Sequence, residues 1–530
     1  MFEMNLRDTL LQNLTTLPGT REFHIHALVS APRKHSALYP FAKPKCRAYL
    51  QDILILLSEQ TTPDSPRILV TAIEAGLYHI PSSSTAILYI SKVDSTGQCT
   101  APSPTATLVR ALLLHYANPT TRPVPADHLW IHLFARAQTQ YLFPNSADFS
   151  GKHPLGDVQL CGWWKRVFTD VAVELTPRDG KSALPVVRLF YVLPGFGQTE
   201  AEYALKPVNA AHPVTQNYQW TYGHPYSQTE IPLPCPGSDA SADSPRNLGL
   251  FIPSFDDDPK SRFMDEIAYT TGPEGIKSPP RKRARTGSSV SRGGSYSVTS
   301  EGNEGKNDSH IETDDRPLGE LGKVSVDEFW ERMSFRQECV AGAVTAFFAL
   351  GIASLIGSAE HSSVSPLAPQ AGQVSSKLNK RIITSLMTGV EFSTRERAIR
   401  ATEVIESTIR RLCEGIAAVP APEIHAPRPR KPPSPSDDKA TNENDSGPTL
   451  LAPPRTPPPR MANGKRVVPD VSPNPFPEPE PSLETYELFI YGSVCISNPI
   501  LKNKAALKEN KDSSASPVTV LTVRRLKRKD

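Results

Sequence analysis

Runs of apolar residues in the first fifth of the chain predict a β-sheet. Segments 23–30, 52–58, 68–80 and 85–90 are rich in Ile, Val, Leu and Tyr, and clusters of Pro and Ser separate them. This spacing is typical of neighbouring strands in an antiparallel or mixed sheet. The fourth run leads into a polar turn that leaves Asp94 at a strand end. A further run, 128–143, is strand-like, with Arg136 and Gln138 set into it.

Helical periodicity appears at other places along the chain. Leucines spaced for one face predict a short helix over 4–16, and similar patterns mark a helix after Ser103-Pro104 and helices at 159–175, 375–387 and 394–416. Trp163 and Trp164 are adjacent on one of these helices, so they point about 100° apart. At most one of them therefore faces deep core, and the other forms a pocket wall or a surface contact.

Two stretches suggest functions that their details do not support. Residues 194–200 follow a predicted strand at 184–193, but they lack the third glycine of a dinucleotide-binding loop. Residues 339–359 carry no charge and are long enough to span a bilayer. They are rich in Ala, Gly, Ser and Thr and have no aromatic or basic flank, so we predict a buried helix. It would continue a helix that Ser325 and Glu328 cap.

Composition indicates one large folded unit with disordered insertions. Pro accounts for 53 of 530 residues, and hydrophobic residues for 38%. We expect a folded domain over 1–415 with a disordered insertion at about 271–320, a Pro-rich linker over 416–482, and strand-like segments with a basic tail over 483–530. Residues 279–285 (PPRKRAR) fit a nuclear import signal, and a solvated basic loop is the alternative.

Charge and cysteine usage exclude several classes. The net charge of +3 gives no global field for nucleic acid, and seven scattered Cys form no CxxC pair. This pattern fits a reducing compartment and argues against a zinc ribbon or a disulfide framework. We expect no metal site. The first residues, MFEMNLRDTL, contain acids and no long apolar core, so they do not resemble a secretory signal.

Residues 255–263 (FDDDPKSRF) are the most distinctive local pattern. Asp258 is a good N-cap acceptor, and Pro259 suits the first helical position. A capped surface helix explains the pattern in structural terms. An acid–base site, in which carboxylates control the charge of a nearby lysine, is the functional alternative.

Six motifs occur together in an order that identifies a family. They are 134–144 (FARAQTQYLFP), 163–165 (WWK), 193–197 (LPGFG), 220–223 (WTYG), 257–263 (DDPKSRF) and 329–333 (FWERM). Their order resembles that of the regulator-of-Ty1-transposition family of fungal histone H3 acetyltransferases, structural relatives of the CBP-type enzymes. The resemblance covers roughly 20–415, with a weaker match in the basic tail from Arg524.

The resemblance implies an α/β (α+β) acetyltransferase fold, in which helices surround a central mixed β-sheet and acetyl-coenzyme A binds in a deep tunnel. It also implies roles for individual residues. Asp258 and Trp164 would be catalytic or line the lysine channel, with Asp94 and Asp257 nearby, and Lys260 would become autoacetylated. The implied cofactor contacts are Phe134, Ala135, Arg136, Ala137 and Tyr141, with Lys152 and Arg262 at the phosphates.

Elementary chemistry is compatible with these roles. A lysine must be neutral to attack a thioester, and deprotonation at pH 7 costs about 4–5 kcal/mol. A dry aromatic channel lowers that cost because it disfavours the ammonium. A carboxylate such as Asp258 raises the lysine pKa, so its value as a base must come from its position. Acetylation of Lys260 would remove a charge that otherwise occupies the neighbouring carboxylates.

The resemblance implies a nuclear enzyme that acetylates lysines in the core-proximal helix and tail of histone H3. Its partners would be histones H3–H4 and chaperones of the nucleosome-assembly and anti-silencing-function types, with roles in replication-coupled nucleosome assembly and DNA damage resistance. The basic tail is the candidate chaperone contact. A non-catalytic adaptor for histone chaperones is the alternative. A DNA-binding regulator fits less well because no reading helix is recognisable.

Overall fold

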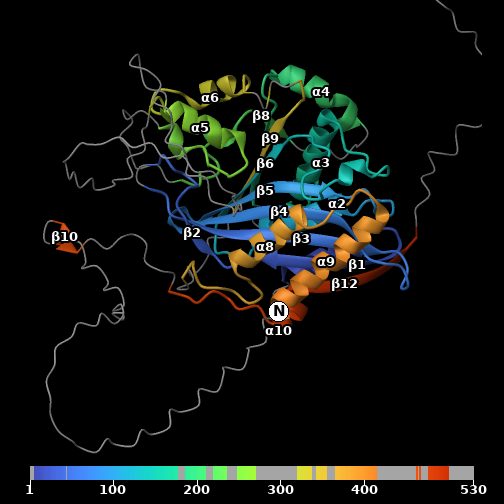
Figure 1. Ribbon diagram of the computed structural model, residues 1–530. Helices are drawn as coiled ribbons and strands as arrows, with labels where there is room; N and C mark the ends of the chain where they lie inside the picture. The colour runs from blue at the N-terminus through green and yellow to red at the C-terminus, as the bar shows by residue number, and fades with distance from the viewer. Residues whose placement is uncertain are drawn as a thin grey trace, which may run out of the picture.

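A single mixed β-sheet forms the centre of the molecule (Figure 1). The computed structural model describes residues 5–42, 45–176, 185–210, 219–235, 247–269, 319–336, 339, 342–354, 365–414, 461–462, 465–466 and 475–499. The sheet has 10 strands in the order β12-β1-β3-β4-β5-β6-β9-β7-β8, with β2 paired to β3. The strands are β1 (Gly19–Val29), β2 (Arg33–His35), β3 (Ala48–Gln60), β4 (Ile68–Ile80), β5 (Thr85–Ser95), β6 (His128–Ala135), β7 (Val186–Val192), β8 (Trp220–Tyr222), β9 (Ala346–Ala353) and β12 (Tyr491–Asn498).

Helices cover both faces of this sheet. On one face, α1 (Leu6–Leu14), α2 (Thr105–Ala117), α3 (Asp157–Leu175) and α4 (Gln198–Ala210) pack on the largest apolar cluster. On the other face, α8 (Ser376–Thr388) and α9 (Arg395–Glu414) cross β3 and β4, as Figure 1 shows in front of the sheet. Beside them, α5 (Pro259–Tyr269) and α6 (Val326–Met333) form a separate cluster with Phe347. The predicted central mixed sheet surrounded by helices is therefore confirmed.

A parallel pair in the middle of the sheet opens a space at its carboxyl ends. Strands β5 and β6 run parallel, and their pairing ends at Ile90 and Leu133. Both strands continue past this point, to Ser95 and Ala135. In sheets of this kind, ligands bind beyond the carboxyl ends of parallel strands, where neighbouring strands separate.

The C-terminal part of the described chain completes the edge of the sheet. Strand β12 pairs antiparallel with β1 along eight residues, from Gly19 opposite Asn498 to His26 opposite Tyr491. The prediction of strand-like segments within 483–530, of which the first is expected at 487–496, was partly right. Residues Tyr486–Ile490 form a π-helical turn instead, and its Tyr486 and Ile490 side chains are buried against α9.

The predicted buried helix over 339–359 is wrong. The helix that Ser325 caps ends at Met333, and Ala346–Ala353 form strand β9 between β6 and β7. All eight residues of β9 are buried. One face of the strand packs in the cluster that α3 covers, and on the other face Phe347 packs against α5 and α6, while Ala349 and Ala353 pack in a cluster with Trp130 and Phe190. A strand buried on both faces reads as a continuous apolar run without alternation, which periodicity cannot distinguish from a buried helix.

Other expectations were confirmed or lie outside the described residues. The predicted strand at 68–80 matches the observed bounds, and the strands at 23–30 and 52–58 and the helices at 159–175, 375–387 and 394–416 lie within four residues of them. The strand predicted at 85–90 begins as expected but continues to Ser95. The strand-like run at 128–143 ends at Ala135. The import-type run, most of the Pro-rich linker and the basic tail lie outside the described residues. Among the described residues, no helix is long and apolar enough to cross a membrane.

Candidate active site

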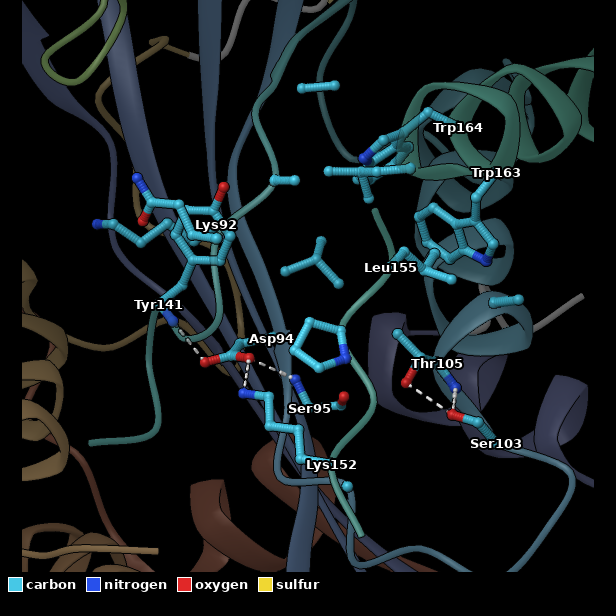
Figure 2. Close-up of a pocket in the computed structure, with 18 of the residues that line it drawn as sticks. Lys92, Asp94, Ser95, Ser103, Thr105, Tyr141, Lys152, Leu155, Trp163 and Trp164 are labelled. Atoms are coloured by element: carbon cyan, nitrogen blue, oxygen red, sulfur yellow. Dashed lines mark hydrogen bonds and ion pairs between the residues drawn. The ribbon is translucent and has the colours of Figure 1, made fainter. Parts of the chain in front are cut away.

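A cavity of about 510 Å³ lies where β5 and β6 separate. Its lining combines strand ends, the segment after β6, the loop before α3 and the first turns of α2 and α3. The residues that the argument uses are Lys92, Asp94, Phe134, Ala135, Arg136, Ala137, Tyr141, Lys152, Trp163 and Trp164. In Figure 2, Lys92 and Tyr141 lie across the cavity from Trp163 and Trp164. This volume falls within the range of about 300–1,000 Å³ that small-molecule sites occupy.

Asp94 fixes one wall of the cavity. Its Oδ2 accepts from the backbone N–H groups of Tyr141, Leu142 and Phe143 at 2.7, 2.8 and 3.1 Å. Its Oδ1 accepts from the N–H of Ser95 and from Lys152 Nζ, at 2.8 and 2.9 Å. Five donors therefore converge on one carboxylate that is only 6% exposed. This geometry makes Asp94 the anchor of the Tyr141 segment and of the Lys152 loop.

The two tryptophans of α3 form the opposite wall. Trp164 is 4% exposed and packs into the core, whereas Trp163 is half-buried. Their rings meet edge to face, with centroids 4.7 Å apart. The prediction that only one of them faces deep core is confirmed, and both contribute to the cavity. An aromatic wall of this kind excludes water from anything that lies against it.

Tyr141 closes the cavity on the side of β6. Its hydroxyl donates to the carbonyl oxygen of Arg136, and this hydrogen bond joins the two ends of the segment 136–141. Burial raises the pKa of Tyr141 to about 12. The phenol therefore remains a hydrogen-bond donor at neutral pH and holds the backbone of 136–141 in a fixed curve around the cavity.

The predicted phosphate contacts lie in different places. Lys152 reaches the cavity, but its Nζ also donates to Ser146 Oγ at 2.7 Å and pairs with Asp94. Arg136 is half-buried at the cavity wall. Arg262 is exposed on α5 and does not line this cavity. The roles of Lys152 and Arg262 at phosphates therefore stay predictions.

Asp258 and Lys260 form a buried ion pair next to the cavity rather than in its lining. Lys260 Nζ pairs with Asp258 Oδ2, and the Lys260 N–H donates to Oδ1 at 2.9 Å. The two residues are 1% and 3% exposed. The Lys260 ammonium also lies 4.4 Å from the centre of the Phe347 ring. The predicted helix cap is present, but this part of the helix is buried rather than exposed.

The charge of this pair affects its neighbours. Burial, and then the nearby Lys260 ammonium, lower the pKa of His132 to about 3. Burial and the carboxylates of Asp258 and Asp257 raise the pKa of Tyr89 well above its usual value. Because the surroundings are aromatic and dry, the Asp258 carboxylate can pair with another amine only after the Lys260 ammonium has moved away from it.

Sequence reasoning missed a second ionic group at the same end of β5. Lys92 lines the cavity, and its Nζ pairs with Glu74 at 2.8 Å and with Asp257 at 3.2 Å. Alternation along the strand could have pointed to Lys92, because it lies two residues from Asp94. Glu74 carried no such signal, since only the sheet register places it opposite Lys92.

The cavity can hold the arm of an acyl-coenzyme A. A pantetheine arm needs backbone groups along its length, and β5 and β6 continue past the end of their pairing beside the cavity. A thioester also needs a dry wall, which Trp163 and Trp164 form. Within the described residues, no group of three His, Cys, Asp or Glu side chains could hold a metal ion.

Comparison with known proteins identifies the class. Residues 118–408, more than half of the chain, match the family model of the histone acetyltransferase KAT11-type domain. The chain therefore belongs to the KAT11-type histone acetyltransferase family.

Individual relatives narrow this class to one group. The histone acetyltransferase rtt109 of Aspergillus flavus is 29% identical over 385 residues, which are 69% of this chain and 59% of that protein. The match thus spans less than two thirds of that relative. The rtt109 of Schizosaccharomyces pombe is 23% identical over 62% of this chain and 68% of its own. The crystal structure of Rtt109 from Aspergillus fumigatus matches with a TM-score of 0.54 and 25% identity, over 76% of this chain and 95% of that one. The resemblance drawn from six motifs is confirmed.

Proposed function

We propose that this chain transfers acetyl groups from acetyl-coenzyme A to lysines of histone H3. The observation that carries the proposal is the cavity at the ends of β5 and β6, which brings Asp94, Tyr141, Trp164 and residues 134–137 together. The acetyl arm would lie along 134–137 with its thioester near the tryptophan wall. Family membership supports the same chemistry.

The reaction needs a neutral amine at the thioester. The lysine nitrogen attacks the acetyl carbonyl carbon, a carbon–nitrogen bond forms and the carbon–sulfur bond breaks. The acceptor ammonium gives up two protons, one of which the leaving thiolate takes while the other goes to solvent. The dry wall formed by Trp163 and Trp164 disfavours the ammonium and so assists the first proton loss.

We propose that Asp258 guides the acceptor amine and that Lys260 controls its availability. The buried ion pair between them supports this role, because a carboxylate that is already paired cannot receive a second ammonium. Acetylation of Lys260 would turn its side chain into a neutral amide and release Asp258 toward the acceptor. The same step would leave the aromatic contacts of the side chain largely in place.

The substrate and cellular setting follow from the resemblance. We propose that the acceptors lie in the core-proximal helix and tail of H3, presented as H3–H4 by chaperones of the nucleosome-assembly and anti-silencing-function types. The enzyme would work in the nucleus, during replication-coupled nucleosome assembly and in resistance to DNA damage. The import-type run at 279–285 and the basic tail support this setting.

Acetyl transfer to a chaperone-bound H3–H4 complex tests the proposal. Radiolabelled acetyl-coenzyme A is incubated with the wild-type chain, with Asp258→Asn and with a control, Asp265→Asn, on the same helix. We expect transfer by the wild type and the control, and a loss of about 100-fold or more in Asp258→Asn, the size typical of a positioned acid–base group. Absence of transfer by the folded wild type in the presence of chaperones would support the adaptor alternative instead.

A further inference from the structure

A second cavity, of about 350 Å³, lies on the other side of Lys92. Its floor is formed by β3, β4 and β5, and its sides by α8 and the loop before α5. It shares Ser91 with the cavity between β5 and β6, which we refer to as the cofactor cavity. Four carboxylates line it, those of Asp52, Glu74, Asp256 and Asp257. We refer to this second cavity as the acidic groove.

The ammonium of Lys92 lies at the junction between the two cavities. A β-bulge places it there, since Glu74 is opposite Lys92, Ala75 is opposite Ile90, and Ser91 is the extra residue. The Ser91 hydroxyl donates to the Glu74 carbonyl oxygen at 3.2 Å and fixes the bulge. Lys92 itself belongs to the lining of the cofactor cavity, while both of its carboxylate partners line the groove.

We propose that the acceptor lysine reaches the cofactor cavity through the acidic groove, and that its ammonium takes the position between Glu74 and Asp257 that Lys92 holds in the substrate-free chain. This inference rests on the proposed acetyltransferase function and assigns its acceptor site. Lys92 is then a positioning residue that competes with the acceptor.

The groove suits an extended peptide that carries a lysine. Tyr78 and Tyr89 supply apolar surface for the aliphatic stem of the lysine, while carboxylates receive its charge. Asp52 is already matched by Arg33, at 2.5 and 2.9 Å. The carboxylates at the Lys92 end therefore give the groove its cation preference. Asp257 also directly precedes Asp258 in the chain, and both carboxylates act on Tyr89, which lines the groove.

Lys92 is suited to hold the position without reacting. Burial acts to lower its pKa, but the hydrogen bond and charge of Glu74, together with Asp257, outweigh burial and raise the pKa of Lys92. A firmly protonated amine is not a nucleophile, so Lys92 does not consume the acetyl donor. The same carboxylates keep an acceptor protonated in this position, so it is an entry position, and the acceptor loses its proton only when it moves on to the dry wall of Trp163 and Trp164. An acceptor that displaces it exchanges one ammonium for another, which leaves the two carboxylates compensated throughout.

Binding and kinetics of four variants test this inference. The variants are Lys92→Met, Glu74→Gln, Asp257→Asn and the control Lys377→Met, which removes an equally charged but 83% exposed side chain on α8. A fluorescein-labelled H3 peptide that contains the acceptor lysine is titrated with each full-length variant, without acetyl-coenzyme A. Steady-state acetylation of the same peptide, unlabelled, then gives separate KM values for peptide and acetyl-coenzyme A.

We expect Lys92→Met to bind the peptide about fivefold more tightly than wild type, because it removes the competing ammonium, and Lys377→Met to bind as wild type. Glu74→Gln and Asp257→Asn weaken the hold on Lys92 and on the acceptor alike, so each is also made in the Lys92→Met background, where no ammonium competes. There, each should weaken binding by about fivefold, the value of a partly exposed ion pair. The KM for acetyl-coenzyme A should stay constant in Glu74→Gln, Asp257→Asn and Lys377→Met, because none of these residues lines the cofactor cavity. Unchanged or weaker peptide binding by Lys92→Met would overturn the inference.

The two readouts separate this inference from the proposed function. If wild type transfers acetyl but Lys92→Met binds peptide no more tightly than wild type, the groove assignment fails and the enzyme assignment stands. If wild type transfers no acetyl and Lys92→Met still binds more tightly, the proposed function fails while the groove remains a site for lysine peptides.

Discussion

Removal of the Asp94 charge should destabilise the fold and the cofactor cavity together. Asp94 and Lys152 form an ion pair in which each side chain is 5% exposed, so solvent screens the pair very little. Asp94→Asn leaves a buried ammonium without its counter-ion, which costs about 3–5 kcal/mol in the free energy of unfolding. It also replaces one of the two acceptor oxygens with an amide NH2, so either the backbone N–H groups of 141–143 or that of Ser95 lose their acceptor.

Urea denaturation measures this loss. With an m value of about 3 kcal/mol per M, the midpoint should fall by about 1–1.7 M. The double variant Asp94→Asn/Lys152→Met removes the orphaned ammonium and should recover at least about 1 kcal/mol of the loss. The KM for acetyl-coenzyme A should rise in Asp94→Asn, because the Tyr141 segment loses its anchor. A loss below about 1 kcal/mol in Asp94→Asn would refute the assignment of Asp94 as the anchor of this wall.

Three further predictions concern other parts of the site. Gly97 has a φ of +75°, and an added Cβ would lie 2.5 Å from Lys152 Cα, so Gly97→Ala should raise the KM for acetyl-coenzyme A. Gly19→Ala, at φ +101° with open space around it, is the matched control and should leave that KM unchanged. Lys260→Gln should lower the acceptor KM relative to Lys260→Arg, since the neutral side chain releases Asp258. If the two variants showed the same turnover and the same acceptor KM in acetylation kinetics, the proposed role of Lys260 would be contradicted. The folded-state pKa of His132, about 3, lies below its unfolded value, so the unfolded chain binds more protons between these values. Folding stability that is present above about pH 6.5 is therefore lost as the pH falls through this window, by up to about 1.4 kcal/mol per pH unit for this one group. The urea midpoints measured at pH 7 and at pH 5 should differ less in His132→Asn than in wild type.

The local pattern of apolar residues was enough to predict most of the sheet and of the long helices. Strand β4 was predicted at its exact bounds, because Pro and Ser clusters flank a run rich in Ile, Leu, Val and Tyr. Helix α9 shows a clear apolar stripe, with Ala398, Ile405 and Ile409 buried on one side. Strand β9 was missed because both of its faces are buried, and this removes the alternation that identifies a strand.

The site was harder to predict than the fold, because its contacts join distant segments. The order of six motifs identified the family, and the folded chain brings Asp94, Tyr141, Trp164 and residues 134–137, whose roles the resemblance implied, into one cavity. Three of the five donors to Asp94 lie almost 50 positions further along the chain, and Lys152 lies further still, so no local pattern indicated its anchoring role. Likewise, only the folded sheet shows that Lys92 is held between Glu74 and Asp257.

Calorimetric titration of the full chain with acetyl-coenzyme A tests the central claim, that the cavity between β5 and β6 is the cofactor site. Ala137 lines this cavity, and Ala137→Trp should fill the space and abolish binding. The control is Ala147→Trp, an exposed position outside the lining. The account predicts binding at one site by wild type and by Ala147→Trp, and no binding by Ala137→Trp. Binding of acetyl-coenzyme A to Ala137→Trp with wild-type affinity would contradict it.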